Sequence, residues 1–110
     1  MIEIRYHRKV LQYLDGLIDV LIDKGYFAFY ETSVQYIEDM VSYIKTNLAL
    51  AQSKPAPPYF EKYGNNLLYI TYRKSRRTTW YIFFQKYDNL YFIRHITNNH
   101  VAGQHFASML

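Results

Sequence analysis

The spacing of the hydrophobic residues changes at Gly64-Asn65-Asn66, and this change constrains the fold more than any other feature of the chain. Before it, apolar residues recur every three or four positions, which is typical of amphipathic helices. After it, three segments alternate with period two and are rich in aromatic and β-branched residues. These segments are 67–73 (LLYITYR), 78–85 (TTWYIFFQ) and 90–97 (LYFIRHIT).

Two amphipathic helices are predicted before the change. Residues 9–25 (KVLQYLDGLIDVLIDKG) carry an apolar stripe, and Gly25 is well placed to end that helix as its C′ residue. A second helix is predicted at 33–52, where Thr32 with Gln35 could form a capping box. Together these segments indicate a two-helix hairpin.

The remaining signals complete the fold prediction. Residues 2–6 (IEIRY) alternate apolar and polar and predict a first strand, while the prolines of 54–58 (KPAPP) separate the second helix from the sheet. The connections between the later strands are short enough for hairpins, and the second and third of these strands are apolar on both faces, which favours interior positions. We expect one α+β domain over residues 1–110: an N-terminal strand, a two-helix hairpin and a three-stranded antiparallel meander.

Composition limits the chemistry. The chain has 110 residues and no cysteine, which excludes disulfides, thiolate catalysis and thiolate metal sites. No stretch approaches the roughly 20 apolar residues that span a membrane. The N-terminus MIEIRYHRKV lacks the apolar region of a signal peptide. We expect a soluble, cytoplasmic domain without cofactor; a metal site at His100 and His105 would lack a third ligand.

The net charge of +4 is unevenly distributed along the chain. Residues 1–72 carry seven Lys/Arg against eight Asp/Glu, whereas residues 73–110 carry six Lys/Arg against one acid. Four of these cations fall within residues 73–77 (RKSRR), in a strand connection. The imbalance favours an anionic partner, and a solvated hairpin turn is the plainer interpretation of the cluster.

The order of strand, two helices and three strands resembles the RelE/ParE superfamily of type II toxin–antitoxin toxins. Residues 90–100 (LYFIRHITNNH) are similar to the last strand of that family, with Arg94 at the position of its strand arginine. The segment TTWYIFF resembles the preceding strand, and KPAPPYFEKYG resembles the connector from helix to sheet. The middle strand begins with Thr78-Thr79-Trp80 where RNA-cutting members commonly carry Arg, and Arg77 lies just before it.

The resemblance implies a ribosome-dependent mRNA endonuclease, in which the RNA 2′-OH attacks the adjacent phosphate. Arg94 would clamp that phosphate with help from Arg77, because a guanidinium donates to two phosphate oxygens at once. His100 or His95 would act as acid or base. The residues predicted to bind RNA are Arg73, Lys74, Arg76, Tyr81 and Tyr91, the two tyrosines by stacking on bases if their faces are exposed.

Strand alternation tests this set of residues. Arg94 and His95 are adjacent in one strand and so point to opposite faces, unless a bulge or the strand end redirects one of them. His100 lies beyond the strand and escapes this restriction. The alternative role for Arg94 is an internal ion pair with Glu38, Asp39 or another acid.

Two other functions are compatible with the same fold. ParE-like members inhibit DNA gyrase by binding it without catalysis, and a non-catalytic nucleic-acid or protein-binding module is a further alternative. Either toxin interpretation implies a cognate antitoxin protein. Acidic segments of such an antitoxin would complement the basic residues 73–110.

Overall fold

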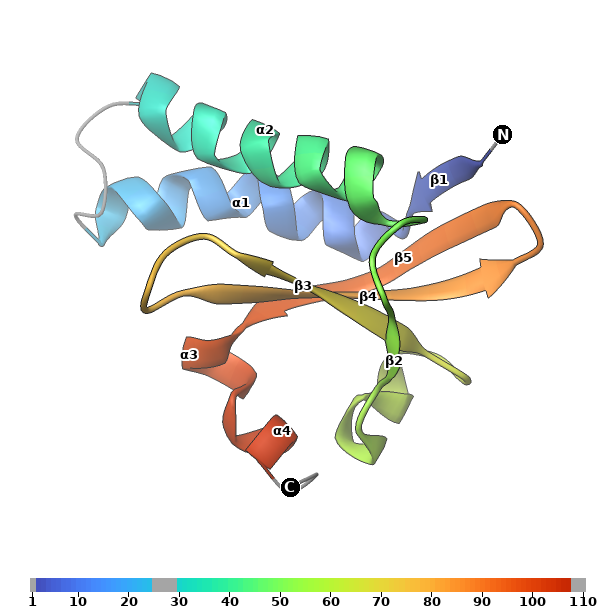
Figure 1. The fold of residues 1–110 in the computed structure, drawn as a ribbon. Coiled ribbons are helices and arrows are strands. Elements are labelled where there is room, and N and C mark those ends of the chain that lie inside the picture. The colour runs from blue at the N-terminus through green and yellow to red at the C-terminus, as the bar shows by residue number, and fades with distance from the viewer. Residues whose placement is uncertain (1, 25–29, 108–110) are drawn as a thin grey trace.

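The computed structural model describes residues 2–24 and 30–107, which form an α+β domain with two helices layered on a five-stranded mixed sheet (Figure 1). The α+β class predicted from the sequence is thereby confirmed. The elements in chain order are β1 (Glu3–Tyr6), α1 (Arg8–Asp23), α2 (Tyr30–Asn47), β2 (Lys54–Pro55), the 3-10 helix η1 (Pro58–Tyr63), β3 (Leu68–Arg73), β4 (Thr79–Tyr87), β5 (Leu90–Asn98), α3 (Asn99–Ala102) and α4 (Gln104–Ala107).

The prediction of a three-stranded antiparallel meander is wrong as a description of this sheet. The sheet has five strands in the order β1-β5-β4-β3-β2, and it is mixed because one pair is parallel. β3, β4 and β5 are antiparallel neighbours, but β1 adds parallel to β5, with Ile4 opposite Tyr91. At the other edge Lys54–Pro55 pairs with β3, a position that tolerates proline because the strand is at an edge. Hydrophobic periodicity predicts strands but carries little information on their partners. The predicted interior positions of β4 and β5 are confirmed.

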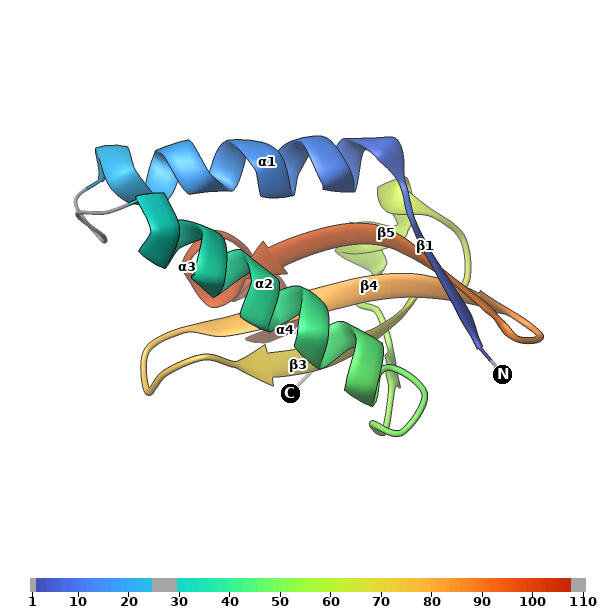
Figure 2. The same cartoon turned by 90° about the horizontal axis from the view of Figure 1, so that it is seen from above.

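Both long helices lie on the same face of the sheet (Figure 1, Figure 2). The apolar stripe of α1 is buried against the strands, because residues three and four apart share one side of a helix. The centre of this core consists of Val10, Leu14, Leu17 and Leu21 from α1, Met40 and Ile44 from α2, and Trp80, Ile82, Phe84 and Ile93 from the sheet.

The boundaries of the second helix differ from the prediction. The described helix comprises Tyr30–Asn47, so Thr32 lies inside the helix and does not cap it. It ends at Asn47, whose side-chain amide donates to the Tyr43 carbonyl at 3.0 Å and so competes with the helical hydrogen bonds. The predicted end of the first helix at Gly25 lies outside the described residues.

A second, smaller core covers the opposite face of the sheet, where η1, α3 and α4 lie (Figure 1). Its buried members are Phe60 of η1, Leu67, Phe83 of β4 and Ala102 of α3. The rings of Phe60 and Phe83 stack with centroids 4.4 Å apart. This packing fixes η1 beside β5, which places the backbone of η1 within reach of the β5 side chains.

Candidate functional site

A groove of about 460 Å³ runs along the edge of β5 where β1 leaves the sheet. The two strands pair as far as Tyr6 opposite Ile93, after which the chain turns into α1. No described strand covers the next residues of β5 on that side, and Arg94–Thr97 line the groove. We call it the β5 groove; its lining residues are His7, Lys9, Val10, Tyr13, Tyr59, Phe60, Lys62, Tyr63, Arg94, His95, Ile96, Thr97, Val101, Ala102 and His105.

A β-bulge brings the two central residues of the groove together. Phe84 pairs with Ile93, and the next pair along the two strands is Phe83 with His95, so Arg94 is an extra residue on β5. The bulge interrupts the alternation that would send Arg94 and His95 to opposite faces. Both side chains line the β5 groove.

Arg94 is half-buried and held from two sides. Its Nε donates to the Tyr63 carbonyl at 2.7 Å, and its guanidinium carbon lies 5.2 Å from the centre of the Phe92 ring. The internal ion pair considered as an alternative role for Arg94 is not present among the described residues. Asp39 pairs with Lys74, and no described acid pairs with Arg94. Its two Nη groups have no protein acceptor among those residues, so they are free to bind an anion.

His95 stacks on Tyr63 with ring centroids 3.7 Å apart and planes 7° from parallel. Burial, and then the charge of Lys62, lower the pKa of His95 to about 4. Its ring nitrogens have no hydrogen-bond partner among the described residues, yet no side-chain polar atom there is buried without a partner. The nitrogens are therefore open to the groove, and at neutral pH the uncharged ring can accept a proton.

Lowering the pH from about 6.5 to about 4 is expected to destabilise the folded protein through His95. In this window the unfolded chain takes up a proton on His95 and the folded chain does not, so the free energy of unfolding falls as the pH falls. We expect a loss on the order of 2 kcal/mol, less than the full shift implies, because solvent reaches the ring.

Urea unfolding of the wild type and of His95→Gln at a series of pH values measures this effect. The stability of the wild type relative to His95→Gln should decrease between pH 6.5 and pH 4. Identical pH profiles for the wild type and His95→Gln would show that burial does not shift this histidine.

The charge of the groove is positive. Lys9 from α1, Lys62 from η1 and Arg94 from β5 line it, and none of its lining residues is Asp or Glu. The Lys62 Nζ lies 4.0 Å from the centre of the Tyr59 ring and 5.4 Å from that of Tyr63. Cations beside aromatic rings suit a ligand that has both anionic groups and planar rings.

Arg77 and His100 lie apart from this groove, so the predicted catalytic residues are divided between two places. His100 Nε2 is 3.1 Å from Thr78 Oγ1, and the Asn99 side-chain amide donates to the Arg77 carbonyl at 3.0 Å. Both contacts tie α3 to the connection between β3 and β4. Neither Arg77 nor His100 is a lining residue of the groove, although Val101 and Ala102 of α3 line it.

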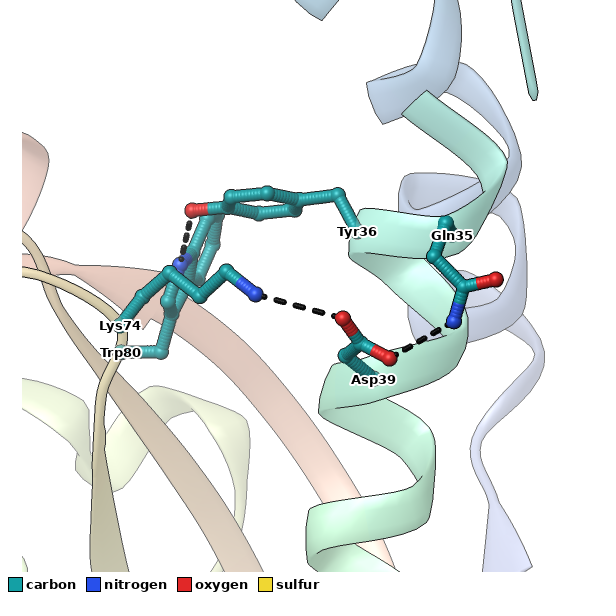
Figure 3. Close-up of polar contacts among 5 residues, drawn as sticks. All are labelled: Gln35, Tyr36, Asp39, Lys74 and Trp80. Atoms are coloured by element: carbon teal, nitrogen blue, oxygen red, sulfur yellow. Dashed lines mark hydrogen bonds and ion pairs between the residues drawn. The ribbon is translucent and has the colours of Figure 1, made fainter. Parts of the chain in front are cut away.

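Lys74, predicted to bind RNA, joins the β3–β4 connection to α2 (Figure 3). Its Nζ lies 3.4 Å from Asp39 Oδ2, and Gln35 donates to the other carboxylate oxygen of Asp39 at 2.8 Å. The hydrogen bond from Gln35 and then the Lys74 ammonium lower the pKa of Asp39. Beside them Trp80 Nε1 donates to the Tyr36 hydroxyl at 2.9 Å. Lys74 therefore has a structural partner.

The other predicted RNA-binding residues are also placed by the structure. Arg73 donates to two carbonyls of its own turn, and Arg76 is exposed. Tyr81 is half-buried and stacks on Phe106 with centroids 4.0 Å apart. Tyr91 is only 7% exposed and belongs to the main core, so its ring faces are not exposed for stacking on bases.

Sequence reasoning missed several residues of the groove: His7, Lys9, Tyr59, Lys62 and Tyr63. Their signals are weak, because a basic HRK after a short strand and an EKY in a connector are both common on protein surfaces. They become informative only when tertiary structure places them around Arg94.

No family model, curated protein or solved structure matches this chain. Within residues 2–24 and 30–107, no three or more His, Asp or Glu side chains lie where they could share a metal ion. In the same ranges no helix has the length and apolar character to cross a membrane. The β5 groove combines Lys9, Lys62 and Arg94 with the neutral imidazole of His95, an arrangement that suits an anionic ligand.

Proposed function

We propose that this protein is a toxin of the RelE/ParE type that cleaves mRNA on the ribosome, with the scissile phosphate bound in the β5 groove. The observation that carries the proposal is the bulge at Arg94, which brings this guanidinium beside the neutral His95. Among the described residues Arg94 has no acidic partner, and none of those that line the groove carries a carboxylate. The position of Arg94 in the last strand of an α+β domain supports the same assignment. A cognate antitoxin with an acidic segment is part of the proposal.

The groove residues fit the steps of such a cleavage. The free Nη groups of Arg94 would donate to the phosphate oxygens, and their bonds would strengthen as charge builds up on the phosphorane. His95 would accept the proton of the attacking 2′-OH, and the bound phosphate would raise its pKa by opposite charge. The departing 5′-oxygen would take a proton from an ammonium group of the groove or from water.

Inhibition of DNA gyrase without catalysis is the second candidate. Two of the residues predicted for catalysis, Arg77 and His100, lie outside the groove. Arg94 and His95 then form a small catalytic set, and a binding protein would need neither of them. This candidate predicts inhibition of supercoiling with intact mRNA.

Induced expression in a bacterial host tests the proposal, with growth and the 5′ ends of cellular mRNA as readouts. We expect growth arrest and new mRNA ends that require ribosomes. Lys62→Ala removes a groove cation and should weaken both effects, whereas the matched control Lys74→Ala, outside the groove and paired with Asp39, should retain them. Arrest with intact mRNA would favour the gyrase candidate, and the absence of any arrest would contradict both.

A further inference from the structure

His7 lies at the junction of β1 and α1 and caps the helix with its side chain. Its backbone is extended, with φ −60° and ψ 143°, and its Nδ1 accepts a hydrogen bond from the Lys9 backbone N–H at 3.0 Å. This satisfies one of the N–H groups that the first turn of a helix leaves without a partner. Histidine is an unusual residue for this position, where Ser, Thr, Asp and Asn are preferred.

The capping bond determines which ring nitrogen carries the proton. A neutral imidazole has one N–H and one acceptor nitrogen. Since Nδ1 accepts from Lys9, the proton must be on Nε2. His7 therefore has a fixed hydrogen-bond donor on the ring edge opposite the cap, without needing a positive charge.

His7 and Arg94 contact the same aromatic ring. The His7 ring packs on Phe92 with centroids 5.9 Å apart, and the Arg94 guanidinium lies over that ring at 5.2 Å. Both residues line the β5 groove. Nε2 has no protein acceptor among the described residues, and it is not buried without a partner. The Nε2–H of His7 can therefore donate a hydrogen bond to a ligand in the groove.

We propose that His7 is a phosphate-binding residue of the β5 groove, in which the capping bond at Nδ1 presents Nε2–H to a phosphate oxygen beside the Arg94 guanidinium. This inference rests on the proposed function, because it requires that the groove holds a phosphate group. It extends the site to the start of α1, on the opposite wall from η1. One residue thus connects the stability of a helix with the binding of the ligand.

The two roles of His7 can be separated by substitution. His7→Ser retains a side-chain oxygen that caps the helix and removes the Nε2–H, whereas His7→Ala removes both. We expect His7→Ser to keep the wild-type melting temperature and to bind inorganic phosphate about tenfold more weakly, as is typical for a lost hydrogen bond to a charged group. His7→Ala should lose affinity to the same extent and melt at a lower temperature.

Isothermal titration of the full chain with inorganic phosphate, with Arg94→Ala as control, gives the affinities. Weaker binding by both Arg94→Ala and His7→Ser supports the inference. Weaker binding by Arg94→Ala alone overturns it and leaves the proposed phosphate site in place. Wild-type affinity in both variants overturns the inference together with the proposed location of the phosphate.

Long-range nitrogen NMR of the histidine rings gives a second readout. If His7 had only a structural role, its ring-nitrogen signals would not change when phosphate is added. From the capping bond we expect an unprotonated Nδ1 and a protonated Nε2 for His7, and a shift of the Nε2 signal as phosphate is added. The opposite tautomer would contradict the proposal. So would a His7 signal that stays constant while the Arg94 side-chain signals move.

Discussion

Replacing Arg94 with Ala is expected to lower the rate of RNA cleavage about 100- to 1000-fold while the protein remains folded, which is the usual effect of removing one donor from a charged transition state. The Nη groups of Arg94 have no described protein acceptor, so their donors would serve the phosphate. In the part of the chain that the structure describes no acid pairs with Arg94, and the main structural loss is the bond to the Tyr63 carbonyl. Cleavage of ribosome-bound mRNA and thermal melting measure the two effects.

Arg94→Lys separates charge from geometry at the same position. Lysine retains the positive charge but lacks the planar fork that contacts two phosphate oxygens together. We therefore expect an intermediate rate for this variant, with little change in melting temperature. A cleavage rate of Arg94→Ala within about threefold of wild type, far below the effect of a lost transition-state donor, would remove Arg94 from the site.

The helices and strands could largely be predicted from the sequence, because each depends on a local repeat. The stripe of α1 follows the helical period, and the aromatic segments of β4 and β5 lie within two residues of the predicted bounds. The partners of the strands could not be predicted in the same way. The parallel pairing of β1 with β5 joins segments more than 80 positions apart, and the hydrophobic pattern within either segment does not predict it.

The groove could be predicted only in part, for the same reason. The resemblance of residues 90–100 to a family strand points to Arg94 and His95, but the bulge that brings them together depends on how β5 pairs with β4. Lys74 was assigned to RNA because its neighbours are basic, whereas its partner Asp39 lies 35 positions earlier in the chain. Lys62 was missed because its connector becomes part of a site only when Phe60 packs on Phe83.

Gly64→Ala is expected to destabilise the protein by about 1–3 kcal/mol and to disturb the groove as well. Gly64 has φ +153°, a conformation that is essentially restricted to glycine. A Cβ there would lie 2.9 Å from Gln85 Nε2 and 3.3 Å from Arg94 Nε. Both side chains are bonded to the neighbouring backbone, Gln85 to the Asn65 carbonyl and Arg94 to that of Tyr63, so neither can move without losing a hydrogen bond.

The chain offers a matched control in Gly16, at the middle of α1. A Cβ at Gly16 would meet nothing within 4 Å, and alanine is favoured over glycine in a helix by about 1 kcal/mol. Gly16→Ala should therefore raise the urea midpoint with unchanged cleavage, whereas Gly64→Ala should lower both. Wild-type cleavage by Gly64→Ala, despite lower stability, would mean that the contact of Gly64 with Arg94 does not position the guanidinium. In that case the bulge and the Phe92 ring would be sufficient to hold it.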